Sequence, residues 1–448
     1  MTLPRWVHYA AAASILSLGY FSGLANVRMH NNESAWIGTS YYFEAFLGDD
    51  VSQSRPDLPA DVWSENFWTL TQPPLALYVL GVARRLGGLT ITDLNEPWVH
   101  NDARINARDV PAQVPSTRLL LWSRGGMTFL SVVSGLLLFF IVARCAGFIA
   151  AYAFLGLFVT NPFLLETLRR AMGDPVVTVF GIAALAVTIL GLDATARDGR
   201  DGRPRASRAR LALWAIAAGA CCGLSGAAKL NGLSAAFGVA TVVFVVVAFA
   251  RRPALATAPV SSSPPVTLHA ARWGAATVAV ALVAAAASVA FIAPSPYLRR
   301  GPIHGTLKML EHRQSGVARQ RQLNPVYPVD GVIAGALNTG YRVLFKPAPL
   351  RFPGAWVFSL SCMLVGFGVL LRDALRGVKA RAPNASFALV VVGATQTIPS
   401  IFSPLDFDRY YLFPTLFANV CLAIGFAVVT ARAAQVVGAS TRHSRRNA

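Results

Sequence analysis

The sequence is poor in charged residues, and above all in acidic ones. Only 14% of its 448 residues are charged while 54% are hydrophobic, and 21 Asp and Glu stand against 40 Lys and Arg. A soluble protein of this composition would expose large apolar surfaces to water. The scarcity of charge therefore excludes an ordinary soluble fold and predicts an all-α, polytopic integral membrane protein.

Cysteine is also scarce, and its positions exclude two common uses. The five cysteines lie in or beside apolar runs and lack metal-ligand spacing. We therefore expect neither a disulfide framework nor a structural zinc site. The sequence also lacks an internal repeat of the kind that marks many inverted-repeat transporters.

Long apolar runs are present instead, and a helix needs about 20 such residues to cross a bilayer. The predicted spans are Val7–Val27, Leu119–Ala143, Gly147–Phe163, Pro175–Leu192, Leu211–Ala228, Leu230–Ala250, Trp273–Ala293, Trp356–Leu371, Ser386–Phe402 and Tyr410–Ala431. This gives about ten transmembrane helices. Arg5 before the first run and the small residues Gly23-Leu24-Ala25 leave a cleaved signal peptide as an alternative, but the run is long enough to span.

The net charge of +19 is spread over several helix ends rather than one face, which argues against nucleic-acid binding. Basic clusters lie in 197–210, 251–252, 372–381 and 432–446, and the positive-inside bias places these segments and both termini in the cytoplasm. Two large extracytoplasmic loops follow, the acidic 28–118 and the basic 294–354. The basic charge of the second loop conflicts with the bias, although its length is near the limit of that rule.

The expected organisation has three parts. Residues 1–293 form an N-terminal transmembrane module that includes the acidic loop, residues 294–354 form the basic loop, and residues 355–448 form the closing transmembrane helices with a basic cytoplasmic tail. Within the acidic loop, Ala35–Phe46 and Leu75–Leu89 predict short helices at the membrane interface.

The acidic loop carries the residues that suggest chemistry. Asn32-Glu33 follows the first span, and Gln72-Pro73-Pro74-Leu75 leads into the second short helix. This arrangement resembles the GT-C membrane glycosyltransferases, in the branch of protein O-mannosyltransferases and lipid A aminoarabinose transferases. That branch has an Asp-Glu pair after the first span and a His- or Lys-Pro-Pro-Leu motif. The resemblance continues through Arg169–Pro175, Lys229–Gly232 and Arg409–Pro414, so it covers most of the chain.

The resemblance implies a GT-C fold and inverting, metal-independent transfer of a sugar from a polyprenyl-phosphate donor, with no cofactor. The usual candidate for the base is the first acidic residue of the pair, which is Asn32 here, and an amide cannot accept a proton at neutral pH. We therefore expect Glu33 to be the base, with Asp174, or the loop residues Asp49 and Asp50, as alternatives. A different interpretation of Glu33 is that it only caps a helix near Ala35.

The remaining predicted site residues bind the donor. Lys229 lies between two apolar runs, where a cation needs a partner, and the resemblance assigns it to the donor phosphate. Arg169, Arg170 and Arg409 suit phosphate oxygens. The predicted sugar site is shaped by the regions around Asn32, Tyr42, Gln72, Pro73 and Tyr410. Two alternatives remain open. Lys229 can lie in a short outer turn and extend its side chain to the membrane surface, and Arg169 and Arg170 can anchor the chain at the membrane interface.

Asp406-Phe407-Asp408 has the spacing of a divalent-metal site, but we expect no metal there because the resembling branch is metal-independent. The predicted partners are a polyprenyl-phosphate sugar, membrane lipid and an acceptor hydroxyl on a protein, lipid or polysaccharide. The active site is expected at the extracytoplasmic face of the cell membrane. The rival interpretation is a transporter or lipid flippase, in which Lys229 and Asp174 would mark a substrate path.

Overall fold

The computed structural model describes residues 3–48, 73–98, 106–200, 208–249, 265–323, 327–345 and 354–446. Within these ranges the chain is helical, and its one β contact is an isolated bridge between Pro328 and Leu405. The α-helices are α1 (Arg5–Phe21), α2 (Asn31–Gly38), α3 (Tyr42–Leu47), α5 (Leu75–Leu86), α6 (Thr117–Thr160), α7 (Pro162–Arg169), α8 (Asp174–Arg200), α9 (Arg208–Ala228), α10 (Ser234–Phe249), α11 (Pro265–Ile292), α12 (Pro296–Arg300), α13 (Pro302–Leu323), α14 (Gly331–Phe345), α15 (Ala355–Lys379), α16 (Ala385–Ile401) and α17 (Leu412–Arg446). The predicted all-α class is confirmed.

Seven helices in the described ranges are long and apolar enough to cross a membrane, or eight if the bent pair Arg5–Asn26 and Asn31–Leu47 counts as one span. The predicted number of transmembrane helices, about ten, is higher than this count for two reasons. Helix α6 joins two predicted spans through Gly147, whose φ of 83° breaks the helical geometry. Helix α16 has only 17 residues. The figure of ten therefore stays a prediction.

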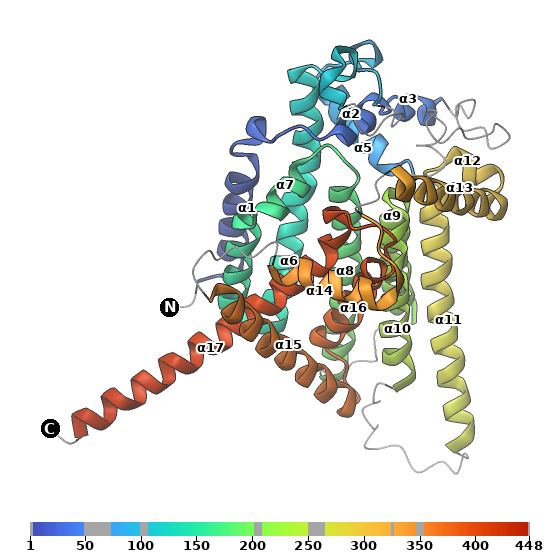
Figure 1. Ribbon diagram of the computed structural model, residues 1–448. Coiled ribbons are helices and arrows are strands. Elements are labelled where there is room, and N and C mark those ends of the chain that lie inside the picture. Colours follow the sequence, from blue (N-terminus) through green and yellow to red (C-terminus); the bar gives the residue numbers. More distant parts are fainter. Residues whose placement is uncertain are drawn as a thin grey trace.

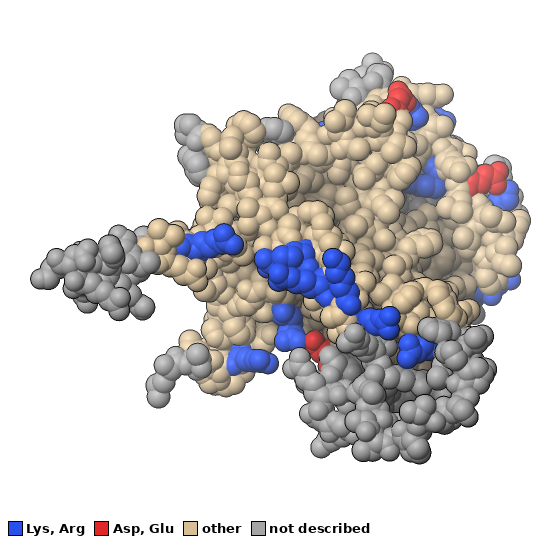
Figure 2. Space-filling model, turned by 90° about the horizontal axis from the view of Figure 1, so that it is seen from below, with Lys and Arg blue, Asp and Glu red and all other residues tan. Residues whose placement is uncertain are grey.

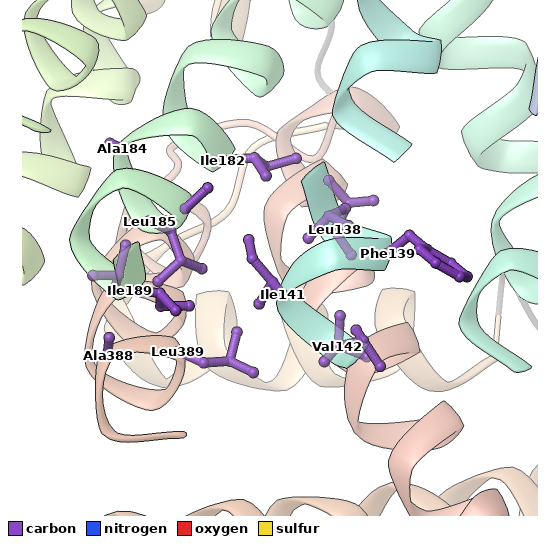
Figure 3. Packing of buried hydrophobic residues seen from close by; sticks show 14 of the residues in the cluster. Leu138, Phe139, Ile141, Val142, Ile182, Ala184, Leu185, Ile189, Ala388 and Leu389 are labelled. Carbon is purple, nitrogen blue, oxygen red and sulfur yellow. The ribbon is translucent and has the colours of Figure 1, made fainter. Parts of the chain in front are cut away.

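The helices pack around an apolar core built mainly from α6, α8, α16 and α17. Figure 3 shows part of this core, in which Leu138 and Ile141 of α6 lie across from Leu185 and Ile189 of α8, with Leu389 of α16 beside them. Water does not drive such packing inside a bilayer, so close van der Waals contact has to hold the helices together. The interdigitated branched side chains provide that contact.

Small residues allow the closest helix approaches. Gly219 and Gly223 of α9 lie against the backbone of α11 at Val283 and Ala287, where a Cβ atom would collide with the carbonyl oxygens. This small-xxx-small spacing is typical of tight helix pairs in membranes. The α9–α11 pair carries Lys229, which directly follows α9, toward the candidate site.

The two ends of the bundle differ. In Figure 1 the short helices α2, α3, α5 and α12 gather at the upper end together with the longer helix α13. Figure 2 looks at the opposite, lower end, where Lys and Arg side chains far outnumber Asp and Glu. The region predicted as a basic loop, 294–354, is largely helical, because it contains α12, α13 and α14. The three-part division of the chain stays a prediction.

Candidate active site

Helix α2 begins at Asn31, earlier than the sequence suggested, because a capping box forms between His30 and Glu33. His30 is the N-cap, its Nδ1 accepts a hydrogen bond from the Asn32 backbone at 3.1 Å, and Glu33 Oε2 accepts one from the His30 backbone at 2.9 Å. The single helix expected over Ala35–Phe46 is instead two helices, α2 and α3, separated by residues 39–41. Glu33 thus takes the capping role that the sequence left as an alternative.

Glu33 is also half of a buried ion pair. Its side chain is 0% exposed and that of Arg124, on α6, is 1% exposed. Arg124 Nε donates to Glu33 Oε1 at 2.8 Å and Nη2 donates to Oε2 at 2.9 Å, while the Ala171 backbone donates to Oε1 at 2.9 Å. With the His30 contact, the carboxylate accepts four hydrogen bonds from the protein. Little of its lone-pair capacity is left for an acceptor hydroxyl.

A pocket next to this ion pair collects the residues suited to binding and chemistry. Its lining side chains come from α2, α13, the start of α8, the junction after α9 and the 3₁₀ helix Asp408–Tyr411 before α17. The lining consists of Trp36, Gly173, Asp174, Lys229, Arg313, Arg409 and Tyr410. Segments separated by more than 350 residues therefore meet here, and the pocket combines one carboxylate with three cations.

The polar side chains of the pocket contact one another. Lys229 Nζ lies 2.9 Å from Asp174 Oδ1 and 5.4 Å from the centre of the Tyr410 ring. Arg313 Nη2 lies 3.1 Å from the Tyr410 hydroxyl, and the Arg409 guanidinium lies 5.7 Å from the same ring. Three cations therefore surround Tyr410, and only Lys229 among them is ion-paired with a lining carboxylate. Such an arrangement favours an anionic ligand.

Asn32 adjoins this pocket through Arg409. With its amide oxygen turned toward Arg409, Asn32 accepts hydrogen bonds from both terminal guanidinium nitrogens, the one from Nη2 at 3.3 Å. A neutral acceptor holds the guanidinium without cancelling its charge. The amide that stands in place of an acid thus adds no negative charge beside Arg409.

The other predicted phosphate ligands lie elsewhere. Arg169 donates to the Ser22 carbonyl at 3.0 Å and to that of Gly19, and so ties α7 to the end of α1. Arg170 pairs with Glu166 one helical turn away. Neither arginine lines the pocket. In this structure both arginines therefore contact other parts of the protein, and their assignment to the donor phosphate stays a prediction.

The residues predicted to shape the sugar site have mixed positions. Tyr42 is buried in an apolar cluster with Trp36, and its ring stacks 4.8 Å from that of Tyr41. Pro73 is buried directly before the N-cap residue of α5, Pro74. Gln72, Asp49 and Asp50 lie outside the described residues.

The acid pair Asp406 and Asp408 has a protein partner. Arg342 of α14 pairs with both carboxylates, and its Nε lies 2.9 Å from Asp406 Oδ1. Within the described ranges, no group of three or more His, Cys, Asp or Glu side chains is placed to hold a metal ion. The guanidinium occupies the position that a cation would take between these two acids.

Sequence reasoning missed Trp36, Gly173 and Arg313 in the pocket, and Arg124 beside it. Arg124 had a usable signal, because a cation inside the predicted span Leu119–Ala143 needs a buried partner. Arg313 had none beyond its position in a basic segment. Gly173 fits because a Cβ atom there would meet the Trp36 ring at 3.0 Å.

Comparison with known proteins identifies the family. The model of the dolichyl-phosphate-mannose-protein mannosyltransferase family matches residues 60–283, half of the chain. The chain belongs to this family. The resemblance to GT-C membrane glycosyltransferases is thereby confirmed, and with it the multi-pass membrane character. No curated protein sequence matches the chain.

Two solved structures are similar to this chain. The archaeal oligosaccharyltransferase AglB from Archaeoglobus fulgidus, in complex with an inhibitory peptide and a dolichol-phosphate, aligns with 98% of this chain at 14% identity and a TM-score of 0.50. ArnT from Cupriavidus metallidurans, bound to undecaprenyl phosphate, aligns with 98% of this chain at 16% identity and a TM-score of 0.47. The chain covers 52% of the AglB chain and 63% of the ArnT chain.

Proposed function

We propose that this family member is an extracytoplasmic glycosyltransferase that moves a sugar from a polyprenyl-phosphate carrier to an acceptor hydroxyl with inversion. The observation that carries the proposal is the pocket in which Asp174 faces Lys229, Arg313 and Arg409. Family membership favours this function over the transporter or flippase alternative. The sugar and the acceptor, whether protein, lipid or polysaccharide, are left open.

The three cations are the proposed ligands of the donor phosphate. Guanidinium groups suit phosphate oxygens, and an ammonium acts as a point charge beside them. When the bond from the anomeric carbon to the phosphate oxygen breaks, negative charge grows on the departing polyprenyl phosphate. Cations that are already in place stabilise that charge most in the transition state. Sugar transfer therefore needs no metal in this proposal.

Asp174 is the proposed base, in preference to Glu33. The acceptor oxygen attacks the anomeric carbon, its proton passes to the Asp174 carboxylate, and polyprenyl phosphate leaves. Asp174 lines the pocket, whereas all four hydrogen bonds to Glu33 come from the protein. A donor phosphate gives Lys229 a second anionic partner, which releases an Asp174 oxygen for the proton.

The distribution of basic residues supports the proposed location of the reaction. The basic residues at the lower end in Figure 2 fit the cytoplasmic side by the positive-inside bias. Helices α2 and α13, which contribute Trp36 and Arg313 to the pocket, lie toward the opposite end in Figure 1. We therefore place the pocket at the outer face and both termini in the cytoplasm. Cysteines introduced singly near Ile303 and Lys379 test this placement, since only the first should react with an impermeant thiol reagent in intact cells.

Transfer of radiolabelled sugar tests the function itself. Purified protein is supplied with a panel of polyprenyl-phosphate sugars and with membrane extracts as acceptors. We expect label to move from at least one donor and to be lost in Asp174→Asn, while Glu166→Gln, which removes a carboxylate outside the pocket, retains transfer. Failure of the wild-type protein to turn over any carrier would reject the proposal.

A further inference from the structure

Arg124 is a buried cation that the pocket does not use. It lies in apolar helix α6 and donates to both oxygens of Glu33. Its remaining terminal nitrogen donates to the Val27 carbonyl at 2.8 Å and reaches the Leu24 carbonyl at 3.4 Å. One guanidinium therefore joins α6, the end of the α1 segment and the start of α2.

Glu33 extends this connection to the pocket. Its Oε1 accepts the Ala171 backbone hydrogen bond at the start of the bend between α7 and α8. Asp174, the first residue of α8, follows three positions later. The hydrogen bond to Glu33 thus holds the backbone of the Ala171–Gly173 bend in place at Ala171. The orientation of the Asp174 side chain in the pocket depends on the position of this bend.

We propose that Arg124 and Glu33 form a buried positioning pair that fixes the Ala171–Gly173 bend and thereby orients Asp174. The inference rests on the proposed role of Asp174 as the base. It assigns Glu33 a role without proton transfer, and it assigns a role to Arg124, which was not among the predicted site residues. The pair acts through Asp174 rather than on the substrate, because neither member lines the pocket.

A double-mutant cycle in thermal stability tests the pair. Glu33→Gln leaves a buried guanidinium without its counter-ion, and Arg124→Met leaves a buried carboxylate, so each change should strongly lower the melting temperature. The double variant, which leaves no unpaired charge, should lose less stability than the two single losses together. Glu166→Gln with Arg118→Met, whose side chains bond to other partners, should be additive. Additive losses in the test pair would reject the coupling.

Arg124→Lys tests positioning, because it keeps the charge but loses the two-pronged contact. We expect the protein to fold and to bind donor with unchanged KM, while kcat falls about 10- to 100-fold because the base is displaced by a fraction of an ångström or more. The pH profile of kcat should keep its shape, since the base is still Asp174. A wild-type kcat in Arg124→Lys would overturn the positioning role.

Different results would contradict the proposed function and the positioning role. If the wild-type protein transfers no sugar, the proposed function fails, but the stability cycle still reports on the pair. If wild-type transfer is robust and Arg124→Lys moves the acidic limb of the pH profile, Glu33 itself takes part in proton transfer and the inference is wrong.

Discussion

Glu33 and Asp174 are two buried carboxylates on either side of one bend, and their surroundings differ. Glu33 is enclosed by donors from three segments, which are the His30 backbone, the Ala171 backbone and the Arg124 side chain. Asp174 has Lys229 as its ion-pair partner and opens onto a pocket that also holds Arg313 and Arg409. Both acids avoid the cost of an unpaired buried charge. Only Asp174 does so with a partner, Lys229, that a donor phosphate can also bind. This difference separates a site for chemistry from a structural ion pair.

Among the substitutions that test this difference, Asp174→Asn should have the largest effect on sugar transfer. The amide keeps the size of the side chain but cannot accept the acceptor proton, so kcat should fall by about 10²- to 10⁴-fold. Single-turnover transfer of labelled sugar measures the effect, and donor binding should persist. Retention of more than a tenth of wild-type kcat would move the base away from Asp174.

Lys229→Met tests whether the cations of the pocket bind the donor phosphate. Loss of a charge-assisted bond to the donor phosphate should raise the donor KM by about 10- to 100-fold, corresponding to about 1.5–3 kcal/mol. Lys308→Met is a matched control, because Lys308 lies on α13 and pairs with exposed Glu311. An equal rise of the donor KM in both variants would show that donor binding depends on the overall charge of the protein rather than on the pocket.

A smaller contrast separates two arginines that sequence reasoning treated alike. Arg409→Met should weaken donor binding by about tenfold, since a guanidinium that Asn32 holds without neutralising it is lost. Arg169→Met should leave the donor KM unchanged and lower stability by about 1 kcal/mol, because its hydrogen bonds join α7 to α1. Donor titrations and thermal melts of the two variants measure these effects. Raised donor KM in Arg169→Met would return that residue to the phosphate site.

The sequence was informative about the fold because the bilayer imposes simple rules. Long apolar runs and basic ends predicted a helical membrane protein, and the family match confirms it. The breaks inside the runs were harder to predict. The break at Gly147 depends on one backbone conformation, and the 100° bend after Asn26 depends on how the following helix is capped.

The candidate site was partly predictable for a related reason. A charge in an apolar run must have a partner, so Lys229 and Asp174 were marked as functional candidates. The sequence does not reveal which partner each charge takes. Glu33 pairs with Arg124 across 91 positions, and Arg313 reaches Tyr410 across 97. Such contacts depend on helix packing, which local patterns do not specify.

The last prediction concerns His30, which caps α2 beside the two carboxylates. Burial, followed by Arg409 and Arg170, lowers its pKa from 6.5 to about 4, against the opposing effects of Glu33 and Asp174. The unfolded chain therefore binds a proton on His30 between about pH 6.5 and pH 4 that the folded chain does not. Folding stability from this group is complete above pH 6.5 and declines as the pH falls toward 4, by at most about 3 kcal/mol and less after solvent screening.

His30→Asn tests this pH dependence, because Asn caps helices well and does not titrate in this range. Melting temperatures of wild type and variant are compared in detergent at pH 7 and pH 4.5. The wild-type protein should lose more stability between these pH values, and the difference between the two proteins isolates His30 from the other titrating groups. Equal losses would mean that His30 is protonated in the folded protein. Its Nδ1 would then no longer accept the Asn32 backbone hydrogen bond, and Glu33 alone would have to hold the start of α2.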